Sequence, residues 1–198
     1  MATLATTNVK HASSSSNNIV LGSDGSVFMS GHYIQTVNSQ MKTRQSISGS
    51  SSYQATGLSA TITPKSATSK ILIVVNGLYG IYNNTNTQYM VFFKLYNGSS
   101  EITDANATNG TTDNTWKTMF EVSAQSGNHQ QYELLPVQGD YLYTHGGSAG
   151  SAITINLYAR CDDGYTNNPP TTKTLFFNGR NQTNYGTTSS MTLHEIAA

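Results

Sequence analysis

The chain has 198 residues, and its ten Lys plus Arg balance its ten Asp plus Glu. This length suits one compact domain with a short appendage, and the scattered basic residues exclude the positive stripe of a nucleic-acid-binding protein. Eighty residues are Ser, Thr, Asn or Gln, so the surface carries hydroxyls and amides. Because Ser, Thr and Asn lower helix propensity, the composition predicts an all-β chain.

Residues 1–32 differ from the rest of the chain. A polar linker, 13–18, precedes the apolar run Ile19–Leu21, a turn-prone segment, 22–26, and a second short apolar run. We expect a flexible start followed by a small hairpin, which would be marginally stable alone and would therefore dock on a neighbouring subunit or another protein. The residues expected to anchor this arm are Val9, Ile19, Val20, Leu21, Val27 and Phe28.

Residues 33–198 form the predicted β-domain, in which strand-length runs are separated by Gly, Asn, Ser and Pro clusters. The run 153–160 alternates apolar with polar or amphipathic residues, which places one of its faces in a core. We expect an antiparallel β-sandwich of about eight to ten strands, jelly-roll-like because the Cys-Trp-Cys spacing of immunoglobulin domains is absent. The clearest predicted strands are 58–63, 71–78, 89–96, 116–124, 132–137, 153–160, 174–177 and 191–196.

Two of these strands contain apolar runs that do not alternate, 71–75 and 90–93. Because a sandwich strand has only one inner face, these runs should also be covered on their outer face. Either a subunit interface or an overlying loop can provide the cover, and the sequence favours neither. The residues expected at a subunit interface are Leu72, Val74, Met90 and Phe92.

No catalytic or metal-binding motif stands out, so we expect neither an enzyme nor a cofactor. The segment 146–150 matches G-x-S-x-G, but a strand follows it where the nucleophile elbow needs a helix. The five His lack metal-ligand spacing, and neighbours in a strand such as His194 and Glu195 point to opposite faces. Segments 104–113 and 162–164 contain acids suited to Ca²⁺, but an ordinary solvated turn explains them better because the regular ligand spacing of an EF-hand is missing.

Several predicted loops place aromatic side chains beside amides. Such groups hold a sugar by stacking on its C–H face and by hydrogen bonds to its hydroxyls, although most large aromatics belong to cores or interfaces. A glycan-degrading enzyme would need paired carboxylates, whereas Glu101, Glu121, Glu133 and Glu195 lie in separate segments. The residues expected to contact a glycan or receptor are Tyr82, Trp116, Tyr165, Asn181 and Tyr185.

The remaining sequence features concern cellular location. The single Cys161 cannot form an intrachain disulfide and is expected to be an inert, buried residue at the end of a strand. The first residues lack the apolar core of a signal peptide, and the longest aliphatic run, 71–75, is far too short for a membrane span. We expect neither export through a signal peptide nor membrane insertion.

Short phrases at both ends and in the middle of the chain resemble tail-fibre and related virion proteins of tailed bacteriophages, especially cyanophages. The phrases are TTNVKH at 6–11, NNIVLGSDGSV at 17–27, TGLSATITP at 56–64 with SKILI at 69–73, and SMTLHEI at 190–196. They specify the family well and the exact virion component poorly.

This resemblance implies a homotrimeric fibre or appendage protein of the virion, made in the host cytoplasm. Its N-terminal arm would attach to other virion proteins, and its β-domain would face outward, in some members to touch a host-surface glycan. No long repetitive shaft follows Met29, which argues against a long-reaching fibre. A short tail appendage, a head fibre and a capsid decoration protein all remain open.

Overall fold

The computed structural model describes residues 8–10, 12–13, 19–21, 27–48, 52–83, 89–107, 117–121, 134–162, 173–180 and 186–198. Apart from one short 3-10 turn, η1 (Thr103–Ala105), the regular structure of these residues consists of β-strands, and all strand pairs are antiparallel. The predicted all-β class is confirmed.

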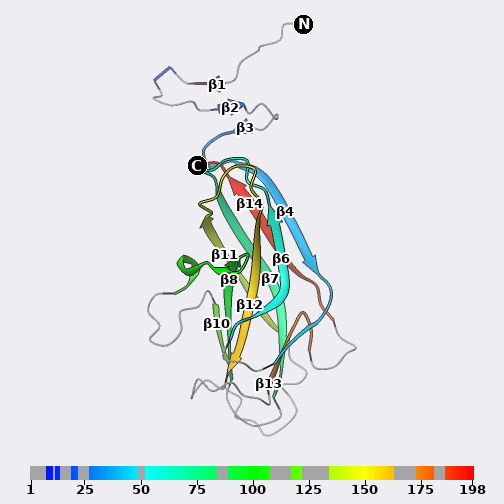
Figure 1. The fold of residues 1–198 in the computed structure, drawn as a ribbon. Coiled ribbons are helices and arrows are strands. Elements are labelled where there is room, and N and C mark those ends of the chain that lie inside the picture. The colour runs from blue at the N-terminus through cyan, green and yellow to red at the C-terminus, as the bar shows by residue number, and fades with distance from the viewer. Residues whose placement is uncertain are drawn as a thin grey trace.

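Two sheets pack face to face and form the sandwich in Figure 1. The first sheet contains β4 (Tyr33–Met41), β14 (Ser189–Ile196), β7 (Lys70–Asn83), β11 (Leu135–Thr144), β13 (Lys173–Phe177) and β5 (Gln45–Ser48). Both β14 and β11 pair with residues 70–76 of β7, so they lie on its opposite edges and the order is β4–β14–β7–β11. At the other end of β7, residues 79–83 pair with β13, which pairs in turn with β5.

The second sheet has the order β10–β8–β12–β6. Its strands are β6 (Gln54–Ile62), β8 (Tyr89–Asn97), β10 (Lys117–Glu121) and β12 (Ile153–Asp162), with β9 (Ser100–Glu101) in a hairpin with β8. The hairpin turn passes through Gly98, whose φ of 60° suits a residue without a Cβ atom.

The strand order is that of a jelly roll. The eight main strands are numbered one to eight here in chain order: β4, β6, β7, β8, β10, β11, β12 and β14. The spatial order in the first sheet is then 1-8-3-6, and in the second sheet it is 2-7-4-5. This arrangement is the double Greek key of a two-sheet jelly roll. The predicted jelly-roll-like sandwich is therefore confirmed, with β5, β9 and β13 as additions to it.

The core lies between the two sheets and is built by strict alternation along each strand. Ile71, Ile73 and Val75 of β7 are at most 1% exposed, and their counterparts Ile155 and Leu157 of β12 are completely buried. Cys161 is buried at the end of β12, as expected for an inert thiol. The intervening residues of both strands face outward, so each sheet has one apolar inner face.

Some predicted strand bounds were wrong. The sequence did not indicate β4 or β5, and the strand expected at 132–137 starts at Leu135 and continues to Thr144. Pro136 and Gly139 interrupt the strand signal in β11, which is compatible with an edge position because the described residues pair β11 only with β7. The predicted outer cover of 71–75 is also absent within the described chain, since Leu72 and Val74 are half-exposed.

Candidate functional site

The N-terminal arm forms a small sheet of its own beyond one end of the sandwich (Figure 1). Its strands are β1 (Asn8–Val9), β2 (Ile19–Leu21) and β3 (Val27–Phe28) in a meander, one strand more than the expected hairpin. The backbone amide of Gly31 donates to the carbonyl of Ala197, and that of Ala197 donates to the carbonyl of His32. The end of the arm is thus tied to the residues that follow β14.

One face of the arm sheet is entirely apolar. Val9 lies opposite Ile19, and Leu21 lies opposite Val27, so these four side chains share a face. Val9 is 45% exposed, and Leu21 and Val27 are each 39% exposed. The expected anchoring residues are therefore assembled into one sheet, with Val20 on its opposite face and the side chain of Phe28 outside the described residues. Nothing in the described chain buries the four-residue face, which we call the arm face.

A second surface is the outer face of the β4–β14–β7–β11 sheet, which we call the open face. Leu72 of β7 lies between His194 of β14 and Leu142 of β11, and Leu142 is 46% exposed. Val74 lies in the next row, between Thr192 and Asp140. The open face is therefore mostly uncharged and half-exposed along its apolar centre.

Hydrogen-bonded polar side chains flank this apolar centre. Asn38 of β4 donates to the hydroxyl of Thr192 at 2.7 Å, and Gln138 of β11 donates to Asn76 of β7 at 3.0 Å. These bonds link neighbouring strands across the outer surface of the sheet. The expected interface residues Leu72 and Val74 thus lie on a preformed surface, whereas the side chain of Met90 lies outside the described residues.

The fourth expected interface residue, Phe92, lies on the outer face of the other sheet and is covered by its own chain. The guanidinium of Arg160 lies 4.7 Å from the ring of Phe92 and 5.3 Å from that of Tyr53. The rings of Tyr96 and Tyr158 stack beside them with centroids 4.1 Å apart. Phe92 is consequently 8% exposed, and this face has an aromatic and cationic cover that the sequence did not indicate.

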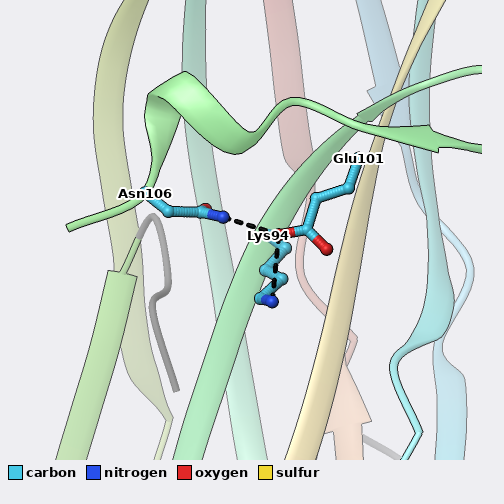
Figure 2. A network of polar contacts seen from close by, with 3 residues as sticks. All are labelled: Lys94, Glu101 and Asn106. Carbon is cyan, nitrogen blue, oxygen red and sulfur yellow. Dashed lines mark hydrogen bonds and ion pairs between the residues drawn. The ribbon is translucent and has the colours of Figure 1, made fainter. Parts of the chain in front are cut away.

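Next to this cover, three polar side chains meet on the β8–β9 hairpin. The Nζ atom of Lys94 lies 3.0 Å from Oε1 of Glu101, and the Nδ2 atom of Asn106 donates to the same oxygen at 2.6 Å (Figure 2). Lys94 belongs to β8 and Glu101 to β9, while Asn106 directly follows η1. The sequence did not indicate this group, because its members come from three elements whose register the sequence does not reveal.

The expected glycan-contacting residues are mostly outside the described part of the chain. Trp116, Tyr165, Asn181 and Tyr185 lie outside it. Tyr82 is described and is half-buried in β7, where its Cα partner is Thr174 of β13. The structure therefore places one of the five residues, and glycan binding by this set stays a prediction.

A buried polar network at the end of the sandwich next to the arm superficially resembles a catalytic triad. Ser69 donates to Oε1 of the buried Glu195 at 2.7 Å, and Nε2 of His145 lies 3.5 Å from the Ser69 hydroxyl oxygen. Because Nδ1 of His145 accepts a hydrogen bond from the Gly147 amide, the ring proton lies on Nε2. His145 therefore presents no lone pair to Ser69 and cannot act as its base.

Glu195 instead fastens a loop to the last strand. Its Oε1 accepts hydrogen bonds from the backbone amides of Lys65 and Ser66, and its Oε2 accepts one from Gln35 of β4. Glu195 faces inward and His194 faces outward, as their alternation in the sequence predicts. The Glu195 carboxylate thus joins this loop and β4 to the last strand.

The described residues contain no group of three or more His, Cys, Asp or Glu side chains that could hold a metal ion. Of the segments considered for Ca²⁺, the residues 108–113 and 163–164 lie outside the described part of the chain. In the described ranges, no helix has the length and apolarity needed to cross a membrane.

Comparisons with known proteins give no family assignment. No protein family and no curated protein matches the sequence. Among solved structures, the fold is similar to that of the infectious bursal disease virus Gx strain, at 13% identity and a TM-score of 0.34. It is also similar to that of an infectious bursal disease virus VP2 subviral particle, at 10% identity and a TM-score of 0.35. Each match covers 84% of this chain but under two fifths of the viral chain, 39% and 38%. At these TM-scores the likeness carries no argument about function.

Proposed function

We propose that this chain is a structural protein of a bacteriophage virion, a compact homotrimer held on the particle by its N-terminal arm. The observation that carries this proposal is the arm face, an apolar sheet face exposed beyond the end of a complete jelly roll. The resemblance of the chain to tail-fibre and related virion proteins supports the same reading. The β-domain then faces away from the particle and contacts a glycan of the host surface.

The arm supports an attachment role because it has no core. Its described strands are two or three residues long, and a sheet of that size needs a partner to be stable. An apolar surface exposed at an end of the molecule is typical of a protein–protein contact. A neighbouring virion protein fits this contact, and the arm face supplies the apolar side chains that it buries.

The open face supports self-association. Leu72, Val74 and Leu142 form an apolar centre on a four-stranded face, and hydrogen-bonded amides flank it. Interface centres are depleted of charge and rimmed by polar groups, which is the pattern here. Three copies related by a threefold axis would each bury this centre, as the resemblance implies.

A capsid decoration or head-fibre protein without a receptor role is the second candidate. It is favoured by the short connection between the arm and the domain, since β3 ends at Phe28 and β4 starts at Tyr33. A long fibre would need a shaft at this position. The compact shape suits a protein that sits close to the particle surface.

The mass of the purified full-length chain, measured by light scattering at micromolar concentration, tests the trimer. We expect three copies in the wild type and a monomer after Leu72→Asp combined with Leu142→Asp. The matched control is Thr61→Asp, which adds a charge at an exposed position on the other sheet and should leave the trimer intact. A monomeric wild type would contradict the trimer.

Incorporation into particles tests the virion role. We expect antibodies against the β-domain to label intact particles, and the arm variant Val9→Asp with Leu21→Asp to leave a folded domain that no longer joins them. Particles without label would overturn the virion assignment. Full incorporation of the arm variant would contradict anchoring by the arm face alone.

A further inference from the structure

Lys94, Glu101 and Asn106 place an amine and a carboxamide on one carboxylate oxygen. Both the Lys94 Nζ atom, at 3.0 Å, and the Asn106 Nδ2 atom, at 2.6 Å, contact Oε1 of Glu101. Figure 2 shows the Asn106 amide and the Lys94 side chain converging on the Glu101 carboxylate from different elements. An amine and a carboxamide that both contact one proton carrier are the components of an amide exchange reaction.

The surroundings hold these groups in place and limit their contact with water. The side chain of Lys94 is 12% exposed and that of Glu101 is 27% exposed. The ring of Tyr53 lies 4.6 Å from the Lys94 Nζ atom, and Tyr158 is the Cα partner of Lys94 on β12. A Lys at a solvated surface samples many rotamers, whereas this one is confined beside its carboxylate and an aromatic wall.

The carbonyl oxygen of Asn106 is the least satisfied atom of the group. Its Oδ1 atom is buried, and no described residue donates a hydrogen bond to it. A buried carbonyl oxygen without a partner is rare and asks for an explanation. In the observed orientation the Nδ2 atom faces Glu101, so a protonated Glu101 carboxyl group is placed to deliver its proton to that nitrogen.

We propose that Lys94 and Asn106 become joined by an isopeptide bond, with Glu101 carrying the proton. The Lys94 ammonium first transfers a proton to the Glu101 carboxylate, which leaves a neutral amine beside a carboxylic acid. The amine nitrogen attacks the Asn106 Cγ atom and forms the new C–N bond. Glu101 then delivers its proton to Nδ2 and accepts the proton from the attacking nitrogen. The Cγ–Nδ2 bond breaks.

The reaction is balanced without any further reactant. Lys–NH₃⁺, Asn–CONH₂ and Glu–COO⁻ become Lys–NH–CO–Asn, NH₃ and Glu–COOH, and ammonia then takes the proton from Glu101 and leaves as ammonium. No atom is oxidised or reduced. The cross-link closes a ring from β8 through β9 to the end of η1, which fixes the hairpin and the 3-10 turn covalently.

This cross-link does not depend on the proposed function, but it suits an exposed protein that cannot use disulfides. The chain has a single Cys, and that residue is buried in the core. A covalent ring limits the conformations of the unfolded chain in the same way as a disulfide does. Unlike a disulfide, an amide bond is unaffected by reductants.

Intact mass spectrometry of the purified, denatured full-length protein tests the proposal. We expect the wild-type mass to be lower than the sequence mass by one ammonia in essentially all molecules. Peptide mapping should identify a branched peptide in which the segments containing Lys94 and Asn106 are joined. A wild type at its full sequence mass, with both residues recovered in separate linear peptides, would overturn the proposal.

Three variants separate the cross-link from a hydrogen-bonded network. Lys94→Arg keeps the positive charge beside Glu101 but removes the primary amine, so it should retain the full mass. Glu101→Gln removes the proton carrier and Asn106→Ser removes the carboxamide, and both should also retain the full mass. Loss of ammonia that persists in Lys94→Arg would refute the assignment, whether or not the other two variants fold.

Discussion

The Oδ1 atom of Asn178 accepts a hydrogen bond from the hydroxyl of Ser189 at 3.0 Å, and both residues are completely buried. Asn178 follows β13 and has a φ of 61°, a left-handed conformation that Asn tolerates better than most residues. Its Nδ2 atom donates to the carbonyl oxygens of Met41 and Thr43. One side chain therefore joins the end of β4, the end of β13 and the start of β14.

Replacement of Asn178 by Ala should destabilise the fold strongly. The change leaves buried hydrogen-bonding groups without partners and places a residue with an ordinary side chain at positive φ, which together should cost about 3 kcal/mol. Urea denaturation of the two proteins measures the loss. Asn38→Ala, which removes an amide from an exposed position, should cost well under half as much. Equal losses in the two variants would show that the Asn178 bonds do not matter.

Gly77 should not tolerate a methyl group. A Cβ atom on this residue of β7 would lie 2.9 Å from Cζ of Phe177 and 3.1 Å from Cγ1 of Val137. Because a packed core resists added volume, we expect Gly77→Ala to lower the free energy of unfolding by about 1–3 kcal/mol. Gly186→Ala, where a Cβ atom would meet nothing within 4 Å, is the control and should be neutral in thermal melts. An unchanged melting temperature in Gly77→Ala would mean that Phe177 moves aside freely.

Glu195→Gln should release the loop that contains Lys65 and Ser66. The carboxylate oxygens of Glu195 accept hydrogen bonds from two backbone amides, a hydroxyl and a side-chain amide, and a Gln would turn a donor toward some of them. Hydrogen bonds to a charged group contribute more than neutral ones, so we expect a loss of about 2 kcal/mol. Hydrogen exchange should then be faster in the backbone amides of Lys65 and Ser66. His194→Gln, on the exposed side of the same strand, should leave this exchange unchanged.

Tyr141 should make the stability of the fold fall at alkaline pH. Burial raises the pKa of Tyr141 above its usual 10.0, and the negative charges of Asp104 and then Tyr143 add to the rise. The folded chain thus holds this proton more tightly than the unfolded chain does. The contribution is complete below pH 10.0 and is lost as the pH rises through the folded pKa.

Ultraviolet titration of the phenol and denaturation curves above pH 10.0 measure this effect. Tyr141→Phe should remove the Tyr141 part of the alkaline loss. Asp104→Asn should lower the pKa of Tyr141 toward its usual value, because it removes one of the neighbouring negative charges. A titration curve unchanged by Asp104→Asn would contradict the electrostatic part of the explanation.

The fold class was predictable because the alternation of apolar and polar residues along a strand directly indicates which side chains are buried. In β12 the pattern of apolar and polar residues matches the observed alternation of buried and half-exposed side chains. The sequence did not indicate β4 because two of its inward-facing positions carry polar residues, Gln35 and Ser39. The side chain of Gln35 donates a hydrogen bond to Glu195. A polar residue that serves a buried hydrogen bond has the same appearance in the sequence as one that faces water.

The candidate surfaces were less predictable, because they depend on which strands become neighbours. The apolar character of Leu72 and Val74 was visible in the sequence, but their pairing with β11 and β14 was not. Conversely, Phe92 looked like an interface residue until the structure placed Arg160 over its ring. The sequence shows which chemical group each residue carries. The residues that this group contacts depend on the register between strands that are distant in the sequence.

The pairing of β4 with β14 sets a limit on how early the domain can assemble during synthesis. Among the described residues, β4 has no other sheet partner, and its partner is the last strand of the fold. Such distant pairings slow folding. The ribosome must therefore release almost the entire domain before β4 can pair with β14. Until then β4 remains an unpaired edge strand, open to aggregation or to exchange between nascent chains.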